Sequence, residues 1–289
     1  MGPFRRFAIL ASVAVVAAMT LPVLAAGAVG GTGYDVSWPQ CGAALPADGG
    51  VAVLGVSGGR PYEDNPCLAS EYGWASSAGR ELAFYMNTAN PGPAGTSVNW
   101  YGQRTPDATC SPAKETACAF DYGYGAAAHA YGYALARTGT AARHSWWLDV
   151  ETGNSWSSDQ ALNGAVVVGA VALLRNKGVP VGVYSTSYQW GRITGGARLD
   201  LPSWVAGARN AGEAAQFCAP SHTVTGGPVA MVQWVQGHFD HDLVCTSLPA
   251  AAPPPPATAP ASSAISGAIA DLLRLNIAKA LADLSPTAR

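Results

Sequence analysis

The sequence carries little charge and has no excess of basic residues. Charged side chains make up 12% of its 289 residues, with 16 Lys and Arg against 18 Asp and Glu. Without Arg5 and Arg6, which belong to the N-terminal segment described next, 14 basic residues face 18 acidic ones, a net charge of −4. A nucleic-acid-binding protein presents a basic face, which this composition does not provide. Nucleic acid is therefore not an expected partner.

The N-terminus lacks an apolar run of membrane-spanning length. The stretch from Phe7 to Leu21 is short, because a span needs about 20 apolar residues. Arg5 and Arg6 precede it, and Ala26-Gly27-Ala28 has the small-x-small pattern of a signal-peptidase site. We expect residues 1–28 to be a signal peptide, cleaved after the last of these residues, and the mature protein to be secreted, in the medium or at the cell wall. An uncleaved membrane anchor is the alternative.

No two cysteines have the two-residue spacing of a structural zinc site, so a metal held by thiolates is not expected. The six cysteines form an even set, which in a secreted protein predicts three disulfides. Six cysteines allow fifteen pairings. We expect neighbours along the chain to pair: Cys41 with Cys67, Cys110 with Cys118, and Cys218 with Cys245.

Apolar runs typical of strands alternate with segments of helical spacing. The expected strands cover residues 34–37, 51–56, 81–86, 146–151, 179–185, 201–206 and 230–235, and the expected helices cover 71–79, 122–136 and 159–175. Ser157 or Ser158 is a candidate N-cap for the last helix. The alternation predicts an α/β fold with a parallel sheet. The strands are apolar on both faces and number seven or eight, which favours a closed TIM-like (β/α) barrel with its active site at the C-terminal strand ends.

The composition divides the mature chain into three parts. Residues 29–248 contain all the expected strands and form a single disulfide-stabilised barrel domain, in which 90–114 is a long loop rich in Pro, Gly and Thr. Residues 249–263 include four consecutive prolines and are expected to be a semi-rigid linker. Residues 264–289 carry apolar side chains at helical spacing, which predicts an amphipathic helix or tail.

Two acids lie two residues apart in the run Trp146-Trp147-Leu148-Asp149-Val150-Glu151-Thr152-Gly153. Side chains alternate along a strand, so Asp149 and Glu151 point to the same side, with Cα atoms roughly 6.5 Å apart. Burial of two like charges side by side raises the pKa of at least one of them. Cleavage of a glycosidic bond needs such a pair, with one acid protonated and the other ionised. A solvated edge strand with two surface acids is the simpler alternative.

Five short motifs occur in an order that resembles a known family. They are Asp35-Val36-Ser37-Trp38-Pro39-Gln40, Leu148-Asp149-Val150-Glu151, Gly182-Val183-Tyr184-Ser185, Trp204-Val205-Ala206, and Gln233-Trp234 followed by Asp240-His241-Asp242-Leu243. In this order and spacing the chain resembles the family-25 glycoside hydrolases, the secreted lysozymes (N-acetylmuramidases) of bacteria and their phages. The resemblance extends over residues 33–246.

The resemblance implies an irregular (β/α) barrel that hydrolyses the β-1,4 bond between N-acetylmuramic acid and N-acetylglucosamine in peptidoglycan or a related glycan. Glu151 would be the general acid, and Asp149 would orient the substrate's 2-acetamido group. Asp35 would support this pair, and Asp242 would complete the acidic floor, with Asp240 as the alternative. The residues expected to bind substrate are Trp38, Gln40, Tyr184, Trp204, Gln233 and Trp234; core packing is the alternative for each aromatic. No metal or other cofactor is expected, nor a membrane partner, and the protein is expected to be a monomer.

Two departures from the family pattern bear on the function. The second strand of the family often ends in a charged run, whereas here it ends in Gly55-Val56-Ser57-Gly58-Gly59. The segment 90–114 is also unusually long. Both lie where substrate specificity would be set. The alternative function is therefore a catalytically inactive secreted protein that binds the cell wall or carbohydrate on the same barrel.

Two other chemistries have weaker support. The segment around Ser57 matches Gly-x-Ser-x-Gly, and the order of Ser57, Asp149 and His222 or His241 is that of an α/β-hydrolase triad. The turn-forming residues after Ser57 argue against this, because the elbow that carries such a serine leads directly into a helix. Residues 238–242 contain His and Asp, which are metal-ligand types, although such a cluster is more often a polar loop.

Overall fold

The computed structural model describes residues 30–92 and 115–247. The expected signal peptide, most of the expected 90–114 loop, and the expected linker and C-terminal helix lie outside the described residues. Within the described ranges, no helix combines the length and apolar character that a membrane span requires.

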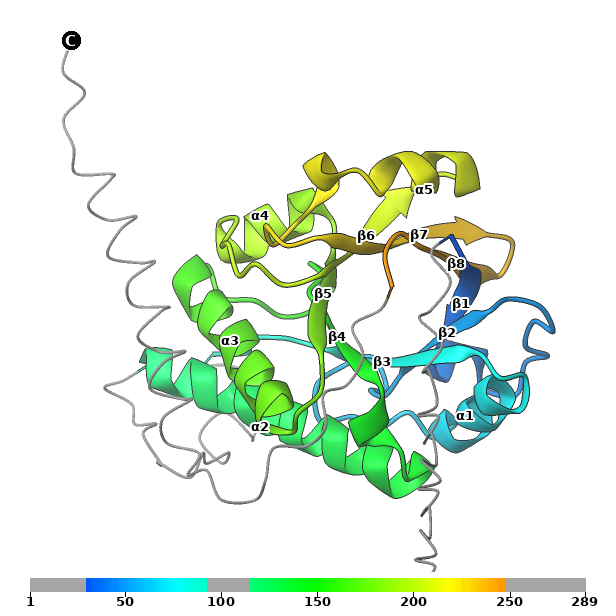
Figure 1. The fold of residues 1–289 in the computed structure, drawn as a ribbon. Helices are drawn as coiled ribbons and strands as arrows, with labels where there is room; N and C mark the ends of the chain where they lie inside the picture. The colour runs from blue at the N-terminus through cyan, green and yellow to red at the C-terminus, as the bar shows by residue number, and fades with distance from the viewer. Residues whose placement is uncertain (1–29, 93–114, 248–289) are drawn as a thin grey trace, which may run out of the picture.

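Eight strands form a closed barrel in which each strand pairs with its sequence neighbours (Figure 1). The strands are β1 Thr32–Val36, β2 Val51–Gly55, β3 Glu81–Asn87, β4 Ser145–Asp149, β5 Val181–Ser185, β6 Ser203–Ala208, β7 Val229–Gln236 and β8 Phe239–Val244. The first seven run parallel to one another. The predicted α/β barrel is therefore confirmed, and each of the seven expected strands forms with ends shifted by a few residues.

The eighth strand is absent from the sequence prediction, and it runs antiparallel to both β7 and β1. Only Gly237 and His238 separate it from β7. A parallel return would need a crossover of a dozen or more residues, whereas two residues suffice for a hairpin. Gly237 has φ 70°, a left-handed backbone that favours glycine in such turns. The expectation of a purely parallel sheet is wrong at this strand, and residues 239–242 are strand residues, not a polar loop.

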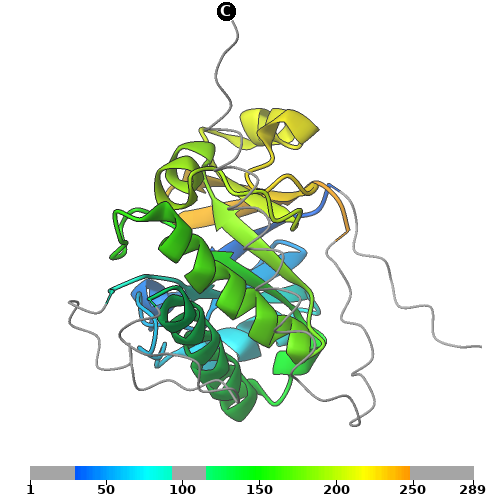
Figure 2. The ribbon, with the colours of Figure 1, turned by 90° about the vertical axis from the view of Figure 1, so that its left-hand side faces the viewer.

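Five α-helices of the described part lie outside the barrel wall (Figures 1 and 2). They are α1 Leu68–Ser77, α2 Glu115–Thr138, α3 Gln160–Asn176, α4 Ser187–Thr194 and α5 Ala211–Phe217. The short α4 and α5 are missing from the sequence prediction, although each begins at a side-chain cap. Thr186 accepts a hydrogen bond from the backbone N–H of Gln189, and Asn210 accepts one from that of Glu213. Capping residues alone, without a long periodic segment, did not indicate a helix.

The N-cap of α3 is Asp159, and not Ser157 or Ser158 as the sequence suggested. The Asp159 carboxylate accepts from the backbone N–H of Ala161 (2.8 Å) and of Leu162 (3.4 Å). The Ser157 hydroxyl instead accepts from the backbone N–H of Asp159 (3.1 Å). A carboxylate at the N-cap also interacts favourably with the helix dipole, which explains why Asp159 and not a serine is the cap.

Helices α2 and α3 lie side by side in both ribbon views and touch through two glycines (Figures 1 and 2). A Cβ at Gly123 would be 1.9 Å from the carbonyl oxygen of Val166, and a Cβ at Gly169 would be 2.0 Å from that of Phe120. Each glycine therefore lets the backbone of the other helix approach. This close contact covers the outer face of the barrel wall with one continuous hydrophobic core.

The barrel interior holds a separate layer of apolar and aromatic side chains. Its members include Val51, Val53, Ala83, Trp147, Trp204 and Met231. Gly182 provides the space for Trp147, because a Cβ at this position would be 2.2 Å from the indole ring. Because side chains alternate along a strand, the residue two positions after each member of this layer also points into the barrel. The polar residues near the C-terminal strand ends therefore lie above the layer.

Two of the three expected disulfides are confirmed. Cys41–Cys67 joins the segment after β1 to the start of α1, and Cys218–Cys245 joins the end of α5 to the segment after β8. The third expected pair includes Cys110, which lies outside the described residues.

Candidate active site

The candidate site is a cluster of carboxyl groups at the C-terminal ends of the parallel strands. Asp35 lies near the end of β1, Asp149 is the last residue of β4, Glu151 follows β4, and Asp240 and Asp242 lie in β8. In the β1–β8 register Asp35 is opposite Asp240. The charge of at least one other member raises the pKa of each of the four aspartates. The fold therefore brings acids from both ends of the described chain to one place.

Asp149 is buried beside Glu151. Its exposed fraction is 5%, Oδ2 accepts a hydrogen bond from Nδ2 of Asn87, and Oδ1 has no hydrogen-bond partner among the described residues. Burial, followed by the charge of Glu151, raises the pKa of Asp149 well above its ordinary value. The raised pKa predicted for one acid of the pair is confirmed, and the alternative of two surface acids on an edge strand is wrong. The pair therefore retains a proton at a higher pH than two exposed carboxyl groups would.

Glu151 is more accessible than Asp149. It lies beyond the end of β4 and is half-buried. Its Oε1 accepts from Nε2 of Gln189 (3.0 Å), and its backbone carbonyl accepts from Nε1 of Trp156 (2.7 Å). Of the two acids, Glu151 is the one that a large substrate reaches more readily.

Asp35 is connected to two other strands through Gln233. Its Oδ2 accepts from Nε2 of Gln233 (2.9 Å), and Oε1 of Gln233 accepts from the hydroxyl of Tyr184 (2.8 Å). Burial, followed by the charge of Asp240, raises the pKa of Asp35 to about 7. Gln233 and Tyr184, two of the residues expected to bind substrate, thus face the interior and are held by the carboxyl cluster itself.

Asp240 and Asp242 both belong to the cluster, at different depths. Asp242 is fully buried, and its Oδ1 accepts from Nε1 of Trp204 (2.8 Å). Burial, followed by the charge of Asp35, raises the pKa of Asp242 well above its ordinary value. Asp240 is partly exposed, and burial, followed by the charge of Glu151, raises its pKa. Asp242 therefore supports Asp35 from below, whereas Asp240 shares the mouth of the site with Glu151.

Sequence reasoning missed three residues of the site: the amide donors Asn87 and Gln189, and Tyr85. Burial, followed by the charge of Asp35, raises the pKa of the Tyr85 hydroxyl well above its ordinary value. Ala83, Tyr85 and Asn87 alternate along β3, so the period-two pattern of this strand could have indicated that the last two face the interior. Gln189 had no such signal, because α4 is too short to show a helical period.

Two of the aromatic residues expected to contact sugar are accessible. Trp38 directly follows β1 and Ser37, and its side chain is 47% exposed. Tyr184 is half-buried at the barrel interior. A flat ring at either position could lie against the apolar face of a sugar.

Two other residues expected to bind substrate, Trp204 and Trp234, are buried, and those expectations need correction; the expectation for a third, Gln40, stays a prediction. Trp204 is only 1% exposed and forms part of the interior layer under the acids. Trp234 points out of the barrel, where its ring stacks on the ring of His241 with centroids 5.1 Å apart. Side chains alternate along a strand, and the preceding residue Gln233 points inward. Oε1 of Gln40 accepts from the backbone N–H of Ser37 (2.9 Å), so this side chain closes the turn after β1.

The described residues support neither the serine-hydrolase triad nor the metal site at residues 238–242. Ser57 is not followed by a helix, because α1 begins only at Leu68. His222 stacks on Phe217 with centroids 4.4 Å apart, and His241 lies outside the barrel. No group of three or more His, Cys, Asp or Glu side chains in the described ranges is arranged to hold a metal ion.

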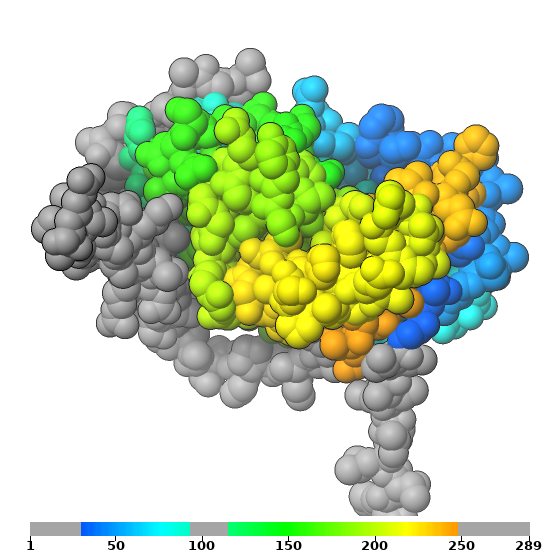
Figure 3. Space-filling model, turned by 90° about the horizontal axis from the view of Figure 1, so that it is seen from above, coloured from blue at the N-terminus to red at the C-terminus, as the bar shows by residue number. Residues whose placement is uncertain are grey.

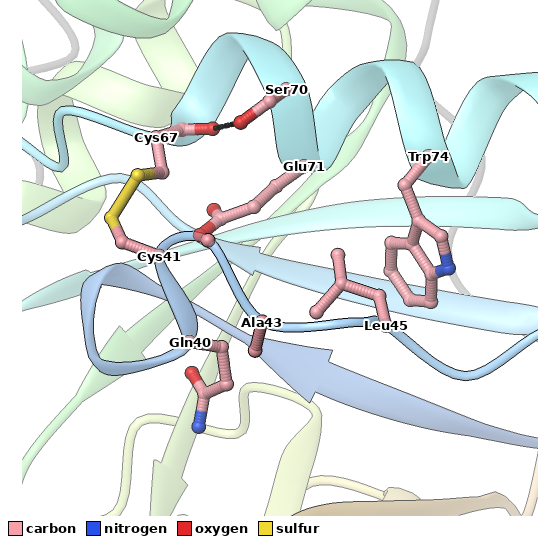
Figure 4. A pocket seen from close by; sticks show the side chains of 9 residues that line it. Gln40, Cys41, Ala43, Leu45, Cys67, Ser70, Glu71 and Trp74 are labelled. Carbon is pink, nitrogen blue, oxygen red and sulfur yellow. Dashed lines mark hydrogen bonds between the residues drawn. A yellow bond between two sulfur atoms is a disulfide. The ribbon is translucent and has the colours of Figure 1, made fainter.

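A pocket of about 300 Å³ lies outside the barrel, between the segment after β1 and helix α1 (Figure 4). It is lined by Gln40, Cys41, Gly42, Ala43, Leu45, Cys67, Ser70, Glu71 and Trp74. The buried Glu71 accepts from Nδ2 of Asn65 (2.7 Å), and burial raises the pKa of Glu71 to about 7. The same Asn65 amide donates to the carbonyl of Gly55 (2.7 Å), so this acid braces the connection between β2 and α1. None of the five clustered acids lines this pocket.

Comparisons with known proteins point to one group. The model of the family described as lysozyme-like protein 1 matches residues 116–218. A probable GH family 25 lysozyme of Dictyostelium discoideum is 39% identical over 64 residues, which are 21% of this chain and 29% of that protein. The chain thus spans less than a third of the length of this relative. The spore cortex lytic enzyme SleM of Clostridium perfringens has a similar fold, with a TM-score of 0.51 and 11% identity over 74% of this chain and 67% of that one. Over parts of its length the sequence is thus similar to lysozyme-like proteins, and its fold is similar to that of SleM.

Proposed function

We propose that this protein is a secreted muramidase-like glycoside hydrolase that cleaves β-1,4 bonds of peptidoglycan, with Glu151 as the general acid. The observation that carries the proposal is the pairing of the buried Asp149, which has an acceptor oxygen without a partner among the described residues, with the accessible Glu151 at the ends of the parallel strands. Glycosidic bond cleavage needs two carboxyl groups in different protonation states. The name of the Dictyostelium relative points to the same class of reaction.

In this mechanism the substrate's own acetamido group is the nucleophile. Protonated Glu151 gives its proton to the glycosidic oxygen while the bond from that oxygen to the anomeric carbon breaks. The acetamido oxygen forms a new bond to the same carbon, and Asp149 holds the acetamido N–H. Water then bonds to the anomeric carbon while the bond from that carbon to the acetamido oxygen breaks, and the carboxylate of Glu151 takes a proton from the water. The two successive inversions at the anomeric carbon retain its configuration.

The surroundings of Asp149 support its role. Asn87 donates to one carboxyl oxygen, which leaves Oδ1 as an acceptor without a partner among the described residues. The indoles of Trp147 and Trp204 fill the interior below, with exposed fractions of 1% each. A hydrogen bond made above this water-excluding layer is stronger than one made in solvent.

The proposal is tested by the release of reducing ends from purified peptidoglycan by the mature protein and by Glu151→Gln. Glutamine keeps the shape of the side chain but cannot donate the proton, so the rate should fall by about 100-fold or more. The variant should still sediment with peptidoglycan. Glu81→Gln, at the first residue of β3 and therefore at the opposite end of the barrel from the cluster, is the matched control and should keep the wild-type rate.

Each other result has a definite meaning. A wild-type protein that sediments with peptidoglycan but releases no reducing ends would favour the alternative of an inactive wall-binding protein. A wild-type protein that neither binds nor cleaves would contradict the proposed substrate. Equal rates for the wild type and Glu151→Gln would show that another group is the acid.

A further inference from the structure

Gln189 makes contacts at the start of α4 that its local sequence does not predict. Thr186 caps this helix, and its hydroxyl oxygen accepts from the backbone N–H of Gln189 (3.1 Å). Thr-x-x-Gln is the sequence of a capping box, in which the Gln side chain returns to the backbone N–H of the cap residue. In this protein the Gln189 side chain reaches away from its own helix instead.

Both ends of the Gln189 amide bind the segment after β4. Its Oε1 accepts from the backbone N–H (2.6 Å) and from the hydroxyl (2.9 Å) of Thr152. Its Nε2 donates to Oε1 of Glu151 (3.0 Å). In Figure 3 the yellow-green surface around α4 adjoins green surface from earlier in the chain, in agreement with these contacts. The amide of Gln189 thus forms hydrogen bonds with both Glu151 and the next residue, Thr152.

We propose that Gln189 is a positioning residue that fixes the carboxyl group of Glu151 and stabilises the ionised form left after proton donation. The inference rests on the proposed function of Glu151 as the general acid. Glu151 lies beyond the strand end, where a half-buried side chain would otherwise rotate among several rotamers. The bond to Oε1 selects one of them and leaves Oε2 for the glycosidic oxygen. A donor to a carboxylate makes a charge-assisted hydrogen bond, which is stronger than a bond between neutral groups.

A purely structural role is the competing explanation, because Gln189 also braces the turn through Thr152. Gln189→Glu separates the two roles. A carboxylate at this position can still accept both hydrogen bonds from Thr152, but when ionised it cannot donate to Glu151. Gln189→Ala removes both the acceptor for Thr152 and the donor to Glu151.

The matched control is Gln160 on α3. Its Nε2 donates to the backbone carbonyls of Gly191 and Arg192 in the same helix α4 (3.2 Å each), and neither of these hydrogen bonds involves Glu151. Gln160→Ala therefore removes a glutamine amide from α4 without touching the acid.

The deciding measurement is the titration of the Glu151 carboxyl carbon by NMR in the mature protein, with the resonance assigned through Glu151→Gln. In Gln189→Ala the midpoint should move to higher pH by about one unit, a tenfold change in proton affinity, because the ionised form loses a donor. Gln189→Glu should move it at least as far, and Gln160→Ala should leave it in place. On peptidoglycan, kcat should fall about tenfold in Gln189→Ala with KM little changed, and the alkaline limb of the rate profile should move in the same direction.

Two results would overturn the inference. One is a wild-type midpoint in both Gln189 variants, and the other is an equal shift in Gln160→Ala, which would assign the effect to the stability of α4. If Gln189→Ala does not fold by circular dichroism, Gln189→Met carries the test, because methionine keeps the length of the side chain without an amide and adds no charge. The titration does not depend on hydrolysis, so an inactive wild type would contradict the proposed function while the NMR result still decides the role of Gln189.

Discussion

The side-chain amide of Gln233 donates a hydrogen bond to the carboxyl group of Asp35 at 2.9 Å and so joins the seventh strand of the barrel to the first. The other end of the amide accepts from the hydroxyl of Tyr184 in the fifth strand at 2.8 Å. The orientation of the amide is therefore set from both sides. A substitution of Gln233 should therefore change the pKa of Asp35, although the two residues lie at opposite ends of the barrel sequence.

We expect Gln233→Leu to raise the pKa of Asp35 above its value of about 7, because the substitution removes a donor that favours the ionised carboxyl group. A carbon NMR titration of the Asp35 side chain measures the change. Gln236→Leu is the control: Gln236 is exposed at the end of the same strand and accepts from Nε1 of Trp234 (3.3 Å). An Asp35 titration that is the same in Gln233→Leu as in the wild type would contradict the stabilisation of ionised Asp35 by Gln233.

The stability of the protein should decrease between about pH 4 and pH 8, which is the reverse of the usual effect of paired carboxylates. Burial raises the pKa of Asp35 from 3.8 to about 7 and that of Glu71 from 4.5 to about 7. In this range the folded state binds more protons than the unfolded state, so the free energy of unfolding falls as the pH rises. For Asp35 alone the loss is at most about 4 kcal/mol, from roughly three pKa units.

Urea unfolding at pH 5 and pH 8, at constant ionic strength, measures this loss. Asp35→Asn should make the pH dependence shallower, and Glu63→Gln, at an exposed position, should leave it unchanged. A free energy of unfolding that rises from pH 5 to pH 8 would be inconsistent with carboxyl groups buried in this way.

Two glycines of the same helix should respond in opposite ways to alanine. A Cβ at Gly169 would be 2.0 Å from the carbonyl oxygen of Phe120, whereas a Cβ at Gly164 meets no atom of the described residues within 4 Å. Gly169→Ala should lower the free energy of unfolding by about 1–3 kcal/mol through overpacking. Gly164→Ala should raise it by up to about 1 kcal/mol through helix propensity. Thermal unfolding of the two variants measures the difference, and a shift of the same sign in both would argue against the close contact of α2 and α3.

The strands and the acid pair could be predicted because each depends on a local repeat. Apolar runs marked seven of the eight strands, and alternation placed Asp149 and Glu151 on one side of β4. The same alternation, applied to β3, would have placed Tyr85 and Asn87 inside the barrel. Two disulfides also followed from the order of the cysteines, since neighbours along the chain are often neighbours in space.

Other features depend on partners that are distant in the sequence. The two-residue turn at Gly237 and His238 makes β8 return antiparallel, and this return places both Asp240 and Asp242 in the cluster. Trp204 and Trp234 look alike in the sequence, but one lies under the acids and the other lies outside the barrel.

The sequence by itself determined that the chain forms an α/β barrel with two acids on one strand, because strand periodicity and like-charge spacing are properties of short segments. Only the tertiary structure decided which groups surround those acids. Gln189 could not be recognised from its capping-box sequence, since its side chain binds across to Glu151 and Thr152 and not to its own helix. Contacts of this kind arise only when closure of the barrel brings the ends of separate strands together, so the pattern of a short segment does not predict them.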